Sequence, residues 1–161
     1  MAPRARGFTL IEIMVVVGIV AILALMTIPA FTDQYVRNQI VEALPLADIA
    51  KAPIAATWAL AHALPADNAS VGLPVPEKVV NNHIRALQID GGAIHLTFGN
   101  RASNAIRGKV LTLRPAIVAD APIVPVAWVC GYAQVPGNMS AQGENRTDVP
   151  SNYLPVACRA L

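Results

Sequence analysis

The sequence has few charged residues and no pattern typical of an active site. Only 14% of its 161 residues are charged, and the formal net charge is +2. So weak a charge argues against a strongly basic nucleic-acid-binding domain. The three histidines, His62, His83 and His95, are isolated, without an HExxH motif, a serine elbow or a pair of catalytic carboxylates. We therefore expect no enzymatic activity, no cofactor and no metal site, with the histidines on the surface or in a hairpin.

The chain is nevertheless rich in apolar residues, and their distribution is uneven. Hydrophobic residues make up 55% of the sequence and are concentrated between residues 8 and 31. From Ile13 to Phe31 no charge occurs, and as a helix these 19 residues would span about 28 Å, close to the thickness of a bilayer core. Arg4 and Arg6 precede this run and predict a cytoplasmic N-terminus with an exported remainder. Because no A-x-A cleavage motif follows the run, we expect it to be retained.

Glu12 is the one carboxylate near the start of the apolar run. Such a residue costs a few kcal/mol in a membrane helix and usually marks a specific partner. A cut between Gly7 and Phe8 would create that partner, since the new α-amine of Phe8 is a cation at a similar depth. The pair could form within one helix, as residues i and i+4, or between neighbouring subunits. The sequence alone leaves both arrangements open.

The heptapeptide Arg6-Gly7-Phe8-Thr9-Leu10-Ile11-Glu12 resembles the class III signal of type IV pilins and related pseudopilins. The resemblance implies cleavage after Gly7 by a prepilin peptidase, N-methylation of Phe8, and docking in which Glu12 neutralises a neighbour's N-terminus. It also implies an inner-membrane precursor with a periplasmic head, assembled by the pilus machinery into an extracellular homo-oligomeric helical filament. Adhesion, twitching motility or DNA uptake would be the filament's role.

The rest of the chain is expected to fold as α+β, in the type IV pilin fold. A long N-terminal helix, with bends or local unwinding at Pro29, Pro45 and Pro53, would pack on a four-stranded antiparallel sheet. The strands are expected at Ile84–Asp90, Ala93–Phe98, Lys109–Val118 and Val124–Val129, with a tight turn at Gly91-Gly92. The expected regions are a cleaved leader (1–7), a membrane and filament-core helix (8–31), its outer half (32–64) and a head (65–161).

Cys130 and Cys158 are the only cysteines, and their spacing fits neither a zinc site nor a CxxC redox motif. A disulfide between them is the natural interpretation, and it implies an oxidising compartment. Closing a loop of this size would contribute roughly 3.5 kcal/mol in the chain-entropy model. The bond would hold a tail of little periodicity against the sheet, which is similar to the disulfide-bounded region of type IVa pilins.

Three alternatives compete with a structural filament subunit. A plain signal anchor is one, but it does not explain Gly7, Phe8 and Glu12 together. A secretion-system pseudopilin shares the leader and helix, but it is disfavoured by the stapled tail and by the lack of an acidic cluster for calcium. A minor pilin that receives DNA is the third; its candidate contacts, in a stretch without acidic residues, are Arg101, Arg107, Lys109 and Arg114.

Overall fold

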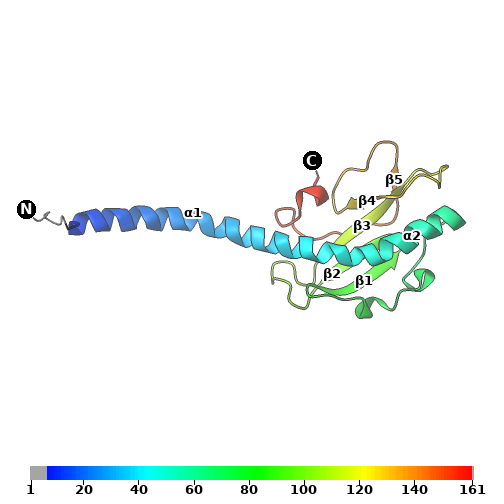
Figure 1. The fold of residues 1–161 in the computed structure, drawn as a ribbon, viewed down its shortest axis with the longest axis horizontal. Helices are drawn as coiled ribbons and strands as arrows, with labels where there is room; N and C mark the ends of the chain where they lie inside the picture. Colours follow the sequence, from blue (N-terminus) through cyan, green and yellow to red (C-terminus); the bar gives the residue numbers. More distant parts are fainter. Residues whose placement is uncertain (1–6, 161) are drawn as a thin grey trace, which may run out of the picture. The chain divides into compact units, whose positions relative to one another are not determined.

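The computed structural model describes residues 7–160, except for the side chains of residues 26–30. The chain divides into two compact units, Met1–Gln34 and Tyr35–Leu161. From here on, the head means the second unit, which adds the outer part of the helix to the expected head of residues 65–161. Helix α1 runs from Leu10 to Ala43 and so belongs to both units (Figure 1). Among the described residues, no helix combines the length and apolarity that crossing a membrane requires.

Helical structure continues in the head beyond α1, and its prolines have different effects. A short 3₁₀ helix, η1 (Leu44–Ala47), contains Pro45 at its start, which confirms the expected local change of winding. Helix α2 (Asp48–Ala61) instead runs through Pro53, and α1 likewise continues through Pro29. The carbonyl that Pro53 leaves without a donor belongs to Ile49, which is exposed enough for water to replace the missing bond. The helix is capped at its C-terminus by His62, whose backbone has the left-handed conformation with φ 53°.

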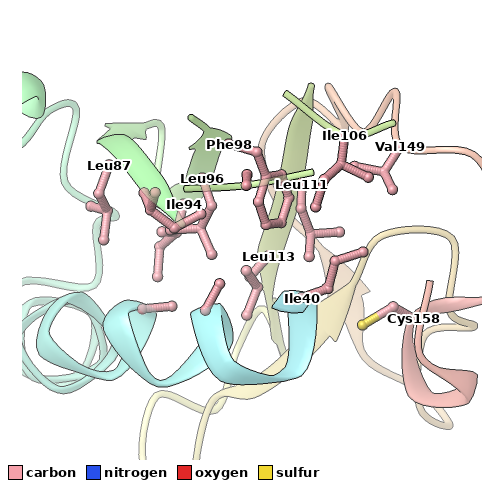
Figure 2. Packing of buried hydrophobic residues seen from close by; sticks show 14 of the residues in the cluster. Ile40, Leu87, Ile94, Leu96, Phe98, Ile106, Leu111, Leu113, Val149 and Cys158 are labelled. Carbon is pink, nitrogen blue, oxygen red and sulfur yellow. The ribbon is translucent and has the colours of Figure 1, made fainter. Parts of the chain in front are cut away.

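One side of this helical segment forms the wall of the core. Its buried residues recur three or four positions apart, as expected for a helix with a single apolar face: Val36, Ile40, Ala43, Ala47, Ala50, Ile54 and Trp58. Figure 2 shows Ile40 of α1 facing Leu113, Leu111 and the strands behind them. Alanines at three of the seven positions let the helix backbone approach the sheet closely.

The sheet contains four main antiparallel strands in the order β1-β2-β3-β4: β1 (Ile84–Asp90), β2 (Ala93–Phe98), β3 (Val110–Ile117) and β4 (Ala127–Cys130). The expected four-stranded sheet is therefore confirmed, with β1 and β2 at the expected bounds and the other two strands shorter. A fifth strand of two residues, β5 (Ser140–Ala141), pairs with β3 and was not expected. Gly91 and Gly92 have φ of 55° and 83°, the conformation that a tight hairpin turn needs.

Side chains alternate between the two faces of the sheet. Leu111 and Leu113 of β3 and Ile94, Leu96 and Phe98 of β2 point into the core under the helices (Figure 2). The intervening residues, among them His95 and Thr112, point to the opposite face. The head thus has a helix-covered face and a second face that is free to receive the C-terminal part of the chain.

The segment between α2 and β1 closes the free edge of the sheet. It contains two short 3₁₀ helices, η2 (Ala69–Val71) and η3 (Pro76–Lys78). The side chain of Asn68, which is 5% exposed, donates hydrogen bonds to the carbonyls of Leu87 and Pro74, both at 2.9 Å. Its carbonyl oxygen accepts a bond from the Ile89 N–H at 2.7 Å. Asn68 therefore occupies the place that a neighbouring strand would take beside β1.

Candidate functional site

The expected processing site lies at the N-terminal limit of the described residues. Residues 1–6 of the expected leader lie outside them, whereas Gly7 and Phe8 are both exposed. A Cβ added at Gly7 would meet no atom within 4 Å. Within the described chain, packing does not require glycine at this position.

Glu12 has a local role in starting α1. Its backbone N–H donates a hydrogen bond to the Thr9 hydroxyl at 3.3 Å, which makes Thr9 the N-cap. Thr9-Leu10-Ile11-Glu12 thus has the sequence pattern of a capping box. A carboxylate in the first turn also stabilises the helix by interacting with the positive end of its dipole. Because α1 begins at Leu10, Phe8 precedes the helix in the unprocessed chain. This cap was not predicted from the sequence.

The N-terminal part of α1 is apolar on all sides, and its side chains are exposed in the single chain. Thirteen large apolar side chains between Phe8 and Leu25 are exposed, from 49% at Ile13 to 78% at Leu10. A helix that is apolar all round is stable only when it is surrounded by other apolar groups. Burying these side chains would contribute on the order of 20 kcal/mol at about 1.5 kcal/mol each. This segment is therefore a surface that other apolar groups must cover rather than a solvent-facing one.

The C-terminal part of the head is fixed by the disulfide between Cys130, the last residue of β4, and Cys158, in η4 (Val156–Cys158). The structure confirms the expected pairing. The Tyr132 N–H donates to the Cys158 carbonyl at 3.0 Å, and Gly131 lies so close that a Cβ there would be 2.8 Å from that carbonyl. On the other side, Arg37 of α1 donates to the Asn152 carbonyl at 2.8 Å, which ties the same region to the helix.

Within this disulfide-bounded region, residues 142–148 form a segment that we call the strap. It begins beside Pro115, whose carbonyl accepts the Gln142 N–H at 2.8 Å, and ends beside Val110, whose carbonyl accepts the Asp148 N–H at 3.1 Å. Alternate β3 residues direct their backbone groups to opposite sides, so these two contacts lie on opposite edges of the strand. The strap therefore crosses β3 over the face that the helices leave free.

Several polar contacts hold the strap in place. The Arg146 side chain binds Asp90 at the end of β1 and Glu144 within the strap, and these hydrogen bonds, that of Glu144 first, raise the pKa of Arg146. Tyr132 donates its hydroxyl to the Thr147 carbonyl at 2.6 Å. Gly143 has φ +80°, and a Cβ there would lie 2.6 Å from that of Ala93. The strap thus packs closely on the β1–β2 turn.

The four candidate DNA-contacting residues are not gathered into one patch. Arg101, Arg107 and Lys109 lie on the loop between β2 and β3, and the first two are exposed. Lys109 forms an ion pair with Asp148 of the strap at 3.6 Å. Arg114 lies within β3 beside Val129, about 16 Å along the strand direction from Lys109. Only two of the four cations are therefore both exposed and on the same loop.

Only one of the three histidines lies on the surface, although the sequence suggested the surface or a hairpin for each of them. His62 is exposed, but His83 is 8% and His95 is 3% exposed. His83 lies 3.3 Å from a Glu42 carboxylate oxygen, and His95, although in the expected hairpin, lies under the strap. Among the described residues no cluster of three histidine, cysteine or carboxylate groups is arranged to hold a metal ion.

A helix with an unprotected apolar N-terminal part, a sheet packed on its continuation and a disulfide-stapled tail define the class of filament-forming subunits. Comparison with known families agrees, since the model for pilin, a bacterial filament, matches residues 36–159, and the prokaryotic N-terminal methylation motif matches residues 3–28. The chain belongs to the type IV pilin family and is a structural subunit of a pilus.

Relatives resemble the chain over nearly its whole length. The type IV major fimbrial protein FimA of Dichelobacter nodosus is 33% identical, with 99% of each chain covered. The type IV major pilin protein PilE1 of Neisseria gonorrhoeae is 30% identical over 96% of this chain and 87% of the relative. The fimbrial protein EcpC of Eikenella corrodens is 30% identical over 96% of this chain and 90% of its own.

Proposed function

We propose that this subunit is made as an inner-membrane precursor, with residues 1–7 as its cytoplasmic leader and its head in the periplasm. A prepilin peptidase then removes the leader after Gly7, and the new N-terminus at Phe8 is methylated. Support comes from Arg4 and Arg6 before the apolar run and from the match to the methylation motif.

In the filament, residues 8–31 form the core, residues 32–64 continue outward, and residues 65–161 carry the surface. The observation that carries this assignment is the exposure of every large apolar side chain between Phe8 and Leu25 in the single chain. Copies of the same helix are the partner that covers such a surface most completely, because each copy has an equally exposed apolar surface to bury. The function is structural rather than enzymatic, and the surface of the head serves adhesion or twitching motility.

Glu12 acts in this assembly by pairing with the Phe8 amine of a neighbouring subunit. A carboxylate surrounded by apolar helices is costly unless a cation meets it, and cleavage supplies one at a fixed position. The pair would therefore set the axial register of one subunit against the next. The observed bond from the Glu12 backbone N–H to Thr9 does not involve the carboxylate. The competing explanation of the side chain is therefore a capping box, in which the carboxylate would reach back to the Thr9 N–H.

Three substitutions distinguish the pair from the cap, with filament yield and membrane-bound precursor as readouts. Glu12→Gln retains a capping box but removes the charge. Thr9→Ala removes the cap, at a cost of about 1 kcal/mol, and retains the charge. We expect Glu12→Gln and Glu12→Ala to abolish filaments without loss of membrane insertion, whereas Thr9→Ala still assembles. A normal filament yield from the Glu12→Gln variant would contradict the proposed pairing of Glu12 with the Phe8 amine.

A second function, reception of DNA by the head, rests on the loop between β2 and β3. Arg101 and Arg107 are exposed there, while Ile106 between them is fully buried and anchors the loop. The loop is further fixed by the Ser103 N–H, which donates to the side chain of Gln39 at 2.9 Å. Two cations on a fixed loop suit contact with a phosphate backbone, whereas Lys109 is paired with Asp148 and Arg114 lies away from the loop on β3.

A further inference from the structure

His95 occupies an unusual position for an ionisable residue of the head. It lies opposite Thr112 in the β2–β3 pairing, on the face that the helices leave free. The strap covers this face, so the imidazole is 3% exposed. The residues on either side of it, Ile94 and Leu96, are buried in the main core. His95 is thus enclosed by the sheet and the strap together.

The hydrogen bonds around His95 connect it directly to the strap. Its Nδ1 atom lies 2.9 Å from the Thr112 hydroxyl, and that hydroxyl accepts the Arg146 N–H at 3.1 Å. The Nε2 atom is buried and has no hydrogen-bond partner within the described part of the chain. A neutral ring satisfies this arrangement at Nδ1, whereas a protonated ring would bury a second N–H donor without an acceptor.

The charges around the ring come from each element packed on it. Arg146 of the strap disfavours a second cation, while Glu144 of the strap and Asp90 at the end of β1 favour it. Arg114 adds a further cation two residues from Thr112 on the same face of β3. Burial, followed by Arg146, lowers the pKa of His95, and the two carboxylates oppose this shift only in part.

We propose that proton uptake by His95 releases the strap from the sheet, so that the outer face of the head is remodelled in mildly acidic surroundings while the core and the disulfide persist. With the strap open, the ring is hydrated and titrates near its ordinary value of about 6.5. With the strap closed, it resists protonation. The open form therefore binds more protons below that pH, and closure weakens as the pH falls from about 6.5 toward the lowered pKa of the closed form.

The strap has the features that such an opening requires. Its backbone is held mainly by side-chain and single backbone bonds rather than by a continuous ladder, and its central residues rest on the polar face of the sheet. β5 fixes the chain directly before the strap, and the disulfide at Cys158 fixes the chain ten residues after it, so opening stays local. Local openings of this kind occur at a lower free energy than global unfolding.

Amide hydrogen exchange on the full chain in detergent micelles tests the proposal. Protection factors, corrected for the intrinsic rate at each pH, are compared between pH 8 and pH 5 for Gln142, Arg146 and Asp148. We expect strap protection to fall up to tenfold per pH unit below about 6.5, as one linked proton requires. The amide of Leu96, in the core-facing register of β2, should keep its protection.

Two variants assign the effect to His95. His95→Gln should make strap protection independent of pH, and His83→Gln, at the other buried histidine, should leave the dependence as in the wild type. The proposal is overturned if strap protection in the wild type does not change with pH, or if His95→Gln changes with pH as the wild type does. Should His95→Gln fail to fold, the imidazole titration of the wild type decides, and a pKa at or above 6.5 overturns the proposal.

Discussion

The substitution Asn68→Ala should destabilise the head severely, although Asn68-Ala69-Ser70 shows no more in the sequence than the pattern of an N-glycosylation sequon. The side chain makes three hydrogen bonds to backbone groups of Leu87, Ile89 and Pro74 and is 5% exposed. At about 1 kcal/mol for each buried bond, its loss should cost about 3 kcal/mol, a large share of a small domain's stability. Two of the three groups lie on the free edge of β1, so the variant should also expose a strand edge to association.

Urea unfolding of the full chain in micelles, followed by tryptophan fluorescence, measures this cost. Both tryptophans, Trp58 and Trp128, lie in the head, so the signal does not report on the bare part of α1. With a slope of about 1.5 kcal/mol/M, the midpoint should fall by roughly 2 M. Asn68→Asp should cost at least as much at neutral pH, because it keeps one acceptor but sets a carboxylate against two carbonyls.

The control for this prediction is Ser70→Ala, which destroys the sequon and leaves Asn68 in place. The Ser70 hydroxyl donates to Asp67 at 2.6 Å in an exposed pair that lowers the pKa of Asp67, so its removal should change stability little. An Asn68→Ala variant within about 0.5 kcal/mol of the wild type would refute the edge-closing role. So would a Ser70→Ala variant that is destabilised as much as Asn68→Ala.

Three further predictions concern the tail and the loop. Gly143→Ala should cost about 2–4 kcal/mol of stability, because it combines a left-handed φ with a clash against Ala93. Gly137→Ala, whose added Cβ meets no atom within 4 Å, should cost about 1 kcal/mol. Thermal unfolding compares the two variants, and equal costs would contradict the close packing of the strap. Replacing both cysteines by serine should remove about 3.5 kcal/mol, and an unchanged melting temperature would show that the staple is dispensable. Charge reversal at Arg101 and Arg107 should abolish DNA binding in a low-salt gel shift, and a wild-type chain that binds no DNA there would end that proposal.

The elements that could be predicted from the sequence are those with local causes. The hairpin of β1 and β2 was placed at its observed bounds because Gly91-Gly92 permits the turn and the flanking residues alternate. The helix and its change of winding at Pro45 likewise follow from periodicity and from a missing backbone donor. The disulfide follows from the presence of only two cysteines.

The features that were missed depend on contacts between distant residues. The sequence predicts His95 on the surface or in a hairpin, but a tail about 50 residues later in the chain covers the face on which it lies. The strap has no periodicity of its own because side-chain bonds to β3 position it. Asn68 reads as a turn residue for the same reason, since its partners on β1 lie about 20 residues away. Neither the burial of His95 nor the edge-closing role of Asn68 can be recognised from a single stretch of sequence.

The N-terminus of the subunit in assembled filaments tests the central claim most directly. Intact mass and terminal-peptide mass spectrometry of sheared filaments should show a chain that begins at Phe8, carries one methyl group on its amine and lacks the two hydrogen atoms that oxidation to the disulfide removes. A filament subunit that retains residues 1–7 would leave Glu12 without its cation and would contradict the account of assembly.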